Sequence, residues 1–474
     1  MTIIFWFRQD LRLSDNVALT EATKSSRNLI PIYIFDDELK SIGEAQYWWL
    51  HHNIASLQES LIHKGITLIL KRGNTEKIFI ELIKKYQIKK IYWNCCYESY
   101  YRKLDSHLKK IFSTLSIEVF IFESNLLIEP QNIKNQSGNY YKVFTPFYNR
   151  ISTLIIPRQP LRVPQNLLKT GPLETEKLED WQLLPKKLNW SLGFNQWKPG
   201  EKNAQVLLKR FIKENLKNYF NKRNRPDICS TSQLSPYLHL GTISVYQILA
   251  AINKAVINDK TLKQSADVFL RQLIWREFAY YLLWYFPEIN KKNFRKKFDN
   301  LKWTKNNSHL KAWQKGLTGY PIVDAGMREL WHTAYMHNRV RMIVASFLVK
   351  DLLIDWREGE QWFWNTLLDA DVANNALGWQ WIAGSGPDAA PYFRIFNPIL
   401  QSKKFDPEGI YIKKWIPELV NVPTKYIHYP ANMPLKIMKS SKIHFGIDYP
   451  FPIISHSQAK YQALKAYKSL SLIK

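Results

Sequence analysis

The sequence predicts a two-part fold, in which an α/β domain with a parallel, Rossmann-like sheet precedes a large all-α domain. Apolar β-type segments alternate with helical segments over the first 125 residues, and strand patterns nearly vanish from about residue 201. A polar stretch rich in proline separates the two regions. We therefore expect an α/β domain over 1–130, an inter-domain connector over 131–200 and a helical domain over 201–474.

Five apolar segments are the predicted strands of the first domain. They are Ile3–Phe7, Leu29–Phe35, Thr67–Leu70, Lys90–Trp93 and Glu118–Phe122. Helical segments between them, such as 46–62, favour a parallel sheet with helices on both faces. No GxGxxG motif follows the first strand, so this domain lacks the fingerprint through which such sheets bind dinucleotides.

The connector is predicted from prolines in a polar stretch with little periodicity. These are Pro157, Pro160, Pro164, Pro172, Pro185 and Pro199. We expect this segment to run over a surface. Beyond it, apolar residues recur at helical spacing, and the predicted helices include Ser265–Phe286, Ala325–Thr333, Asn338–Leu353 and Gln361–Asn365.

Charge and composition narrow the function classes. Lys and Arg number 67 against 40 Asp and Glu, and the net charge of +27 favours nucleic acid or an anionic membrane surface as partner. A basic composition spread evenly over the chain is the alternative. The chain has no run of about 18 apolar residues, no secretory signal pattern and three cysteines without CxxC spacing. We expect a cytoplasmic protein without a membrane span, disulfide framework or cysteine zinc site.

The segment 374–381 holds two tryptophans whose spacing separates their surroundings. In a helix, Asn375 and Trp379 lie one turn apart on one face. Trp381 lies about 200° around the helix from Trp379. The two rings should therefore have different neighbours, so that one could contact a cofactor while the other lines a cavity.

Three further groups could hold a polar ligand. Asn338, Arg341 and Met342 share one helix face, although a solvated basic helix has the same pattern. The hydroxyls and amides of 231–235 precede a helix and could bind phosphate, or could serve as ordinary caps. The pair of acidic residues in 369–371 could form an ion pair with Arg341; a metal would need further ligands, which the sequence does not supply.

Six segments of the chain, several of them long, together resemble the DNA photolyase/cryptochrome family, specifically photolyases that split cyclobutane pyrimidine dimers. They are WFRQDLRLSDN (6–16), YKVFTPFYNR (141–150), LIWREF (273–278), GYPIVDAGMREL (319–330), MHNRVRMIVASFLVKDLLIDWREGE (336–360) and NNALGWQWIAGSGPDAAPYFRIFNP (374–398). The resemblance covers nearly the whole chain. It implies a carbon–carbon lyase with FAD in the helical domain. Light-excited reduced FAD would pass an electron to a flipped-out dimer in double- or single-stranded UV-damaged DNA, the dimer would split, and the electron would return.

The resemblance also implies roles for individual residues. It places FAD contacts at Tyr219, Thr231, Ser232, Gln233, Leu234, Ser235, Arg341, Asp369, Ala370, Asp371 and Asn375. Asn375 would tune the flavin through the ring nitrogen that gains and loses a proton. Electron transfer to the flavin would use Trp379, Trp356 and Trp303. Contacts with the lesion and DNA are implied for Arg223, Gln272, Trp275, Asn338, Met342, Trp381 and Gln401.

The sequence departs from the family pattern at two places. Many relatives carry Glu where this chain has Gln272, which can donate to a dimer carbonyl but cannot relay a proton as a carboxylate. Folate-type photolyases carry Asn-Glu where this chain has Tyr100-Tyr101, so methenyltetrahydrofolate is not expected at its usual site. The identity of any second, antenna chromophore stays open. Glu44, Trp48 and Trp49 could line another antenna site, and core packing is the favoured interpretation.

Other classes of protein share part of this sequence pattern. A cryptochrome photoreceptor shares fold and flavin, but many cryptochromes append a long polar tail, and here a family-like segment (447–464) lies about ten residues from the end. A six-four photolyase needs two histidines at the positions of Asn338 and Met342. A non-catalytic basic nucleic-acid-binding protein would bind no flavin. We expect a monomeric photolyase with DNA as partner and no membrane.

Overall fold

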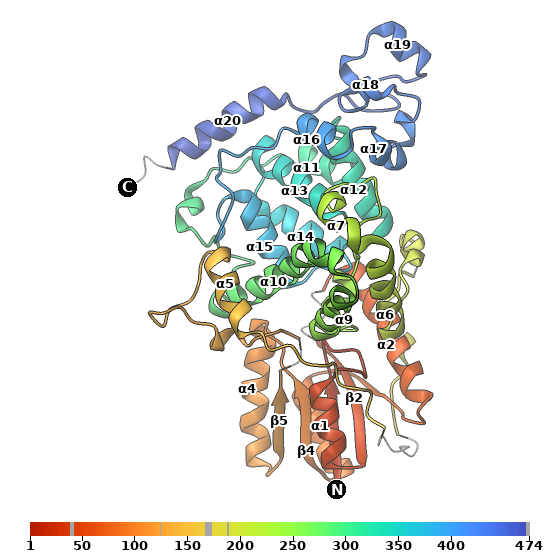
Figure 1. Cartoon of the computed structure of the whole chain (residues 1–474), viewed down its shortest axis with the longest axis vertical. Coiled ribbons are helices and arrows are strands. Elements are labelled where there is room, and N and C mark those ends of the chain that lie inside the picture. Colours follow the sequence, from red (N-terminus) through yellow and green to blue (C-terminus); the bar gives the residue numbers. More distant parts are fainter. Residues whose placement is uncertain (38–41, 124, 166–172, 187–188, 471–474) are drawn as a thin grey trace.

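The computed structural model describes residues 1–37, 42–123, 125–165, 173–186 and 189–470 (Figure 1). A parallel sheet lies at the N-terminal end, with strand order β3-β2-β1-β4-β5. Its strands are β1 (Thr2–Phe7), β2 (Asn28–Asp36), β3 (Ile69–Gly73), β4 (Ile88–Asn94) and β5 (Glu118–Phe122). The helical part follows. The predicted fold class, an α/β domain followed by an all-α domain, is confirmed.

Strand β3 begins later than the sequence pattern predicts. Its pairing with β2 starts at Ile69 opposite Ile32, whereas the prediction was 67–70. The apolar pattern alone does not set this register. The outer edge of β3 is hydrogen-bonded to the connector: the Leu70 N–H donates to the Thr175 hydroxyl (2.8 Å), and the Glu176 N–H donates to the Leu70 backbone oxygen (3.0 Å).

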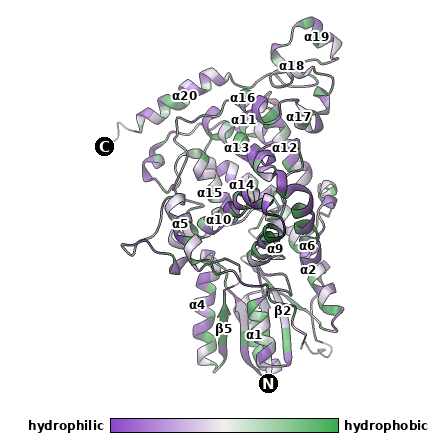
Figure 2. Ribbon diagram, in the orientation of Figure 1, coloured by the Kyte–Doolittle hydropathy of each residue, from purple (hydrophilic) through white to green (hydrophobic). Residues whose placement is uncertain are grey.

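The two faces of the sheet are covered by different helices. Because side chains alternate along a strand, Ile4 and Trp6 pack on one face with α3 (Thr75–Tyr86) and α4 (Ser99–Thr114). Phe5 and its alternate neighbours pack on the other face. There they meet α1 (Val17–Ser25) and α2 (Glu44–Ile62), whose buried side chains join the core of the helical part. In Figure 2, β5 is coloured hydrophobic, whereas α1 and α4 carry both hydrophilic and hydrophobic residues.

The connector contains a helix that the proline pattern did not predict. Helix α5 (Phe144–Leu154) lies within 131–200 and buries Phe144, Phe147 and Ile151, at helical spacing. It packs against α10 (Lys263–Tyr285), beside which it is drawn in Figure 1. The expectation of a segment that only runs over a surface is therefore wrong for this part of the connector.

The helical part consists of helices that enclose a large apolar core. Besides α10, they are α6 (Glu201–Arg210), α7 (Tyr219–Lys222), α8 (Ser235–His239), α9 (Val245–Asn258), α11 (Asn307–Gln314), α12 (Pro321–Thr333), α13 (Asn338–Ser346), α14 (Trp356–Thr366), α15 (Val372–Ala383), α16 (Pro398–Phe405), α17 (Ile410–Trp415), α18 (Thr424–Ile427), α19 (Leu435–Ser440) and α20 (His456–Ser469). The predicted helix 338–353 is α13 followed by a π-helical turn over 347–351. Within the described residues, no helix is both long enough and apolar enough to cross a membrane.

Candidate active site

One cavity of about 590 Å³ in the helical part collects nearly all of the predicted site residues. It opens between α7, α8, α10, α13 and α15. The predicted residues that line it are Tyr219, Arg223, Thr231, Ser232, Gln233, Leu234, Ser235, Gln272, Trp275, Asn338, Arg341, Met342, Asp369, Ala370, Asp371, Asn375, Trp379 and Trp381. Trp303, Trp356 and Gln401 are not among the lining residues. Ligand cavities in proteins commonly occupy a few hundred cubic ångströms, so this space suits an organic cofactor.

An ion pair anchors the polar end of the cavity. The Arg341 Nη2 atom lies 3.0 and 2.9 Å from the two oxygens of Asp369, and the Ser235 hydroxyl donates to the same carboxylate at 2.5 Å. Burial acts to lower the pKa of Arg341, but the charge of Asp369, the hydrogen bond to its carboxylate and other nearby groups together outweigh burial, and the pKa stands above its ordinary value. The predicted Arg341–Asp369 pair therefore exists, and it presents a fixed cation and hydroxyl to a ligand.

The two aspartates of 369–371 have different hydrogen-bond partners and different roles. Asp371 is the N-cap of α15 and accepts hydrogen bonds from the backbone N–H and the side-chain amide of Asn374, each at 2.8 Å. Asp369 instead pairs with Arg341. Among the residues that the structure describes, no group of three or more His, Cys, Asp or Glu side chains is placed to hold a metal ion.

The Asn375 amide is held by a residue that the sequence analysis did not identify. Its Nδ2 group donates to the Glu360 backbone oxygen at 3.0 Å and to the Glu360 carboxyl at 2.9 Å. Both bonds use the amide nitrogen, which leaves the Oδ1 oxygen to accept from a ligand. Burial raises the pKa of Glu360 to about 7, while the bond from Asn375 acts to lower it. Nothing in the spacing of 360 and 375 announces this pair, because they lie on different helices.

The tryptophans of α15 have different surroundings, as the helical spacing predicts. Trp379 is 2% exposed and packs edge-on against Phe363 (5.0 Å between ring centroids) and Trp313 (6.2 Å). Its indole Nε1 has no hydrogen-bond partner in the described part of the chain. Trp381 is half-buried and also lines the cavity. An unpaired buried donor beside a cavity is costly unless a ligand satisfies it.

The other two predicted electron-transfer residues do not line the cavity. Trp356 is fully buried, and its indole N–H donates to the Asn293 side chain at 2.9 Å. Trp303 is half-buried and packs at the edge of the same apolar core. Gln401 lies on α16, outside the cavity lining.

At the other end of the cavity, Trp275 is stacked by an aromatic ring from the connector. The centroids of Trp275 and Phe144 are 3.6 Å apart and their planes differ by 5°. Gln272, one turn before Trp275 on α10, donates to the Val268 backbone oxygen at 3.2 Å. No role was predicted for Phe144, although it lies in the segment YKVFTPFYNR.

The cavity lining fits the FAD that the resemblance implies. A Cβ added to Gly378, on the cavity side of α15, would meet no atom within 4 Å. The nearby Trp379 Nε1 lacks a partner among the described residues, and hydroxyl groups of 231–235 line the same cavity as the Arg341 cation. Open space, an unpaired donor and a cation with hydroxyls suit a planar ring joined to a phosphate-bearing chain.

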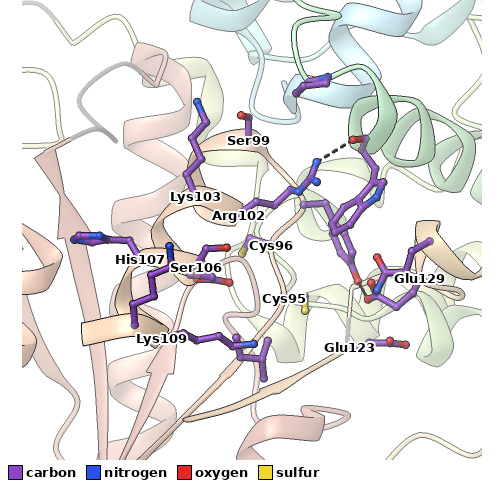
Figure 3. Close-up of a pocket in the computed structure, with 17 residues that line it drawn as sticks. Cys95, Cys96, Ser99, Arg102, Lys103, Ser106, His107, Lys109, Glu123 and Glu129 are labelled. Carbon is purple, nitrogen blue, oxygen red and sulfur yellow. Dashed lines mark hydrogen bonds between the residues drawn. The ribbon is translucent and has the colours of Figure 1, made fainter. Parts of the chain in front are cut away.

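A second cavity of about 840 Å³ lies between α4 and the C-terminal end of α10 (Figure 3). Arg102 crosses it, stacking on Trp284 at 3.6 Å and donating to the Trp284 backbone oxygen at 2.9 Å. Burial raises the pKa of both Cys95 and Cys96 to about 12, so these thiols stay protonated at neutral pH.

The residues considered for an antenna chromophore have protein partners. Tyr101 is buried under the Arg8 guanidinium (5.3 Å to the ring centroid), which forms an ion pair with Asp105 at 2.7 Å. Trp48 and Trp49 are buried in the core that joins the two domains, and the Trp49 indole donates to the Pro236 backbone oxygen at 2.9 Å.

Family models match both parts of the chain. Residues 3–165 match the model described as DNA photolyase, and residues 269–469 match the model described as FAD binding domain of DNA photolyase. The chain is 44% identical over 474 residues to a deoxyribodipyrimidine photo-lyase of Agrobacterium fabrum, covering 99% of this chain and 98% of that one. It is 36% identical to cryptochrome-2 of Arabidopsis thaliana, covering 98% of this chain and 78% of that one.

A solved structure has the same fold over its whole length. The bacterial class III photolyase from Agrobacterium tumefaciens superimposes with a TM-score of 0.95 at 43% identity. The match covers 99% of this chain and 98% of that chain. The arrangement of sheet, connector and helical part is therefore shared with that protein.

Proposed function

The chain belongs to the DNA photolyase family, and on that premise we propose that it is an FAD-dependent enzyme that splits cyclobutane pyrimidine dimers in DNA in light. The observation that carries the proposal is the single cavity in which the implied cofactor residues and lesion residues meet. When bound, FAD supplies the light-absorbing group and the electron for the reaction. The residues of the chain then have to hold the cofactor, hold the lesion and exclude water.

We assign cofactor binding to the polar end of the cavity. The Arg341–Asp369 pair and the hydroxyls of 231–235 would hold the charged part of FAD. The Glu360 carboxyl orients the Asn375 amide, so that its oxygen would be free to accept from the flavin ring nitrogen that changes protonation state. Asp371 contributes through α15, because it caps the helix that carries Asn375 and Trp379.

We assign the lesion to the end of the cavity lined by Trp275 and Trp381. Flat rings suit a pyrimidine dimer that is swung out of the duplex, and a damaged base pair costs less to open than an intact one. Gln272, Asn338 and Met342 line the same space and supply an amide pair and a soft apolar contact. The Gln272 side chain is an amide, so it would act here as a hydrogen-bond donor and not as a carboxylate.

Two supporting roles complete the proposal. Trp379, Trp356 and Trp303 would carry the electron that returns the cofactor to its reduced form, because electron transfer falls steeply with distance and needs oxidisable rings in steps. The exposure of these residues rises in that direction, from buried Trp379 and Trp356 to half-buried Trp303. Arg223, at the cavity lining, and Gln401, outside it, would contact DNA, and the net charge of +27 would supply affinity that does not depend on sequence.

We further propose that the protein acts as a monomer in the cytoplasm, on dimers in either double- or single-stranded DNA. Size-exclusion chromatography with and without a dimer-containing oligonucleotide tests the first point. A complex with one chain for each lesion is expected. Repair rates on matched single- and double-stranded oligonucleotides test the second.

The decisive experiment combines one spectrum with one repair assay. The purified protein should show flavin absorbance, which a non-catalytic DNA-binding protein would lack. With reduced FAD, it should restore a dimer-containing oligonucleotide in light but not in the dark. A matched oligonucleotide with a six-four photoproduct should stay unrepaired. Flavin absorbance without dimer repair would favour a cryptochrome photoreceptor. Repair of the six-four photoproduct would favour a six-four photolyase.

A further inference from the structure

The first residue of helix α5 in the connector packs against Trp275, which lines the lesion end of the cavity. Figure 1 shows α5 between the sheet and the helical part, beside α10. Its buried side chains Phe144, Phe147 and Ile151 face α10, which carries Trp275. Phe144 is 1% exposed, so its ring is part of the protein interior and not of the cavity wall.

The first link from α5 to the cavity is a ring stack. The Phe144 and Trp275 centroids lie 3.6 Å apart with planes that differ by 5°, so one face of the Trp275 indole is covered by protein. Trp275 is half-buried and lines the cavity, and its opposite face is the one left for a ligand. A second ring behind the first restricts the rotation of the indole before any ligand arrives.

The second link joins α5 to the segment that follows Trp381. The backbone N–H of Phe144 donates to the Asp388 carboxylate at 3.3 Å. Asp388 lies in the segment after α15, and the Ala390 N–H in that segment donates to the Trp381 backbone oxygen at 3.2 Å. One residue of α5 is thus connected by its ring to Trp275 and by its backbone to the end of α15 that carries Trp381.

We propose that α5 positions the two lesion-binding tryptophans relative to one another, with Phe144 and Asp388 as the positioning residues. The inference rests on the proposed function, because it takes Trp275 and Trp381 as the rings that hold the dimer. Neither positioning residue touches the lesion. Their effect is to keep the slot between the rings at the width and tilt of a pyrimidine dimer. Less conformational entropy of the two side chains is then lost when the dimer binds.

The variant Phe144→Leu removes the stacked ring and keeps most of the buried volume. We expect the Kd of the FAD-loaded protein for a dimer-containing single-stranded oligonucleotide, measured in the dark, to rise about three- to tenfold. The Kd for the undamaged oligonucleotide should stay within about twofold. This comparison matters because the Arg271 guanidinium lies 5.2 Å from the Phe144 ring and could reach a phosphate. A loss through Arg271 would weaken both oligonucleotides alike.

Two variants separate positioning from a general effect on packing. Phe147→Leu is the matched control, since Phe147 is fully buried on the same helix but packs on Phe278 and Tyr281 instead of Trp275. It should leave lesion selectivity unchanged, even if it lowers stability. Phe144→Tyr keeps an aromatic ring on Trp275 and should retain wild-type selectivity.

Two further variants decide the outcome. Asp388→Ala removes the second link without touching the stacked ring, and should also reduce lesion selectivity, even if Phe144→Leu does not fold. Trp275→Ala tests the premise. If it leaves the Kd for the dimer unchanged, the proposed role of Trp275 is wrong and the inference falls with it. If Trp275→Ala weakens dimer binding while Phe144→Leu and Asp388→Ala keep full selectivity, or while Phe147→Leu loses as much, only the inference is overturned.

Discussion

Gly359 allows α14 to pack directly against the ring of Trp379. A Cβ at this position would lie 2.1 Å from Cη2 and 2.5 Å from Cζ3 of Trp379, and 2.6 Å from Cδ2 of Leu348. Carbon atoms in contact prefer a separation of about 3.5–4.0 Å. Gly359→Ala must therefore push the indole away by roughly an ångström or more, or separate the two helices.

The expected loss of stability in Gly359→Ala follows from two opposing contributions. Overpacking a dense core costs about 1–3 kcal/mol, and here both neighbours are at most 2% exposed, which favours the upper end. Alanine returns up to about 1 kcal/mol through its higher helix propensity. We expect Gly359→Ala to lower the free energy of unfolding of the flavin-free protein by about 2 kcal/mol, seen as a lower urea midpoint at unchanged slope. In the FAD-loaded variant, photoreduction should slow because Trp379 has moved.

Gly378 provides the control on the neighbouring helix. An added Cβ there meets no atom within 4 Å, and the residue lies inside α15. Gly378→Ala should leave the flavin-free protein equally stable or up to about 1 kcal/mol more stable, yet weaken FAD binding because it fills cofactor space. If Gly359→Ala unfolds at the wild-type urea concentration and photoreduces FAD at the wild-type rate, the argument from close packing is refuted.

Three further predictions address the cofactor, the DNA and pH. Trp379→Phe should block photoreduction of oxidised FAD in the presence of an external donor but spare repair by chemically pre-reduced protein, whereas Trp381→Ala should keep photoreduction and lose roughly 1–3 kcal/mol of lesion binding; the opposite pattern would contradict the division of roles. Arg223→Ala should reduce the slope of log K for lesion DNA against log salt by about one, and an unchanged slope would remove Arg223 from the phosphate contacts. Burial holds the pKa of Glu360 near 7, above its unfolded value, so the contribution of Glu360 to the free energy of unfolding declines as pH rises from about 4.5 to 7. In urea titrations of the flavin-free protein, Glu360→Gln should make this loss of stability smaller by about 1–3 kcal/mol. An equal loss in the wild type and the variant would contradict this.

Local sequence pattern was sufficient for the class of fold and for groups on one helix. The strand at 118–122 and the helix over 325–333 follow from periodicity within a short window. One-turn spacing correctly placed Asn338, Arg341 and Met342 on the same cavity wall. These features depend on backbone geometry that each segment carries with it. Assignment of roles to them came from the resemblance to a family, since spacing alone also fits a solvated helix.

Contacts between segments that are distant in the chain were decided by tertiary packing, and no short stretch of sequence predicts them. The polar, proline-punctuated stretch of 131–200 suggested a surface connector, yet the helix at 144–154 buries one face on α10 because that face is apolar and α10 offers a complementary surface. The same contact stacks Phe144 on Trp275. Glu360 meets Asn375 only because α14 and α15 pack closely at Gly359. Such contacts join residues that are far apart in the chain, and their geometry is set by the whole folded core, so only the tertiary structure could decide them.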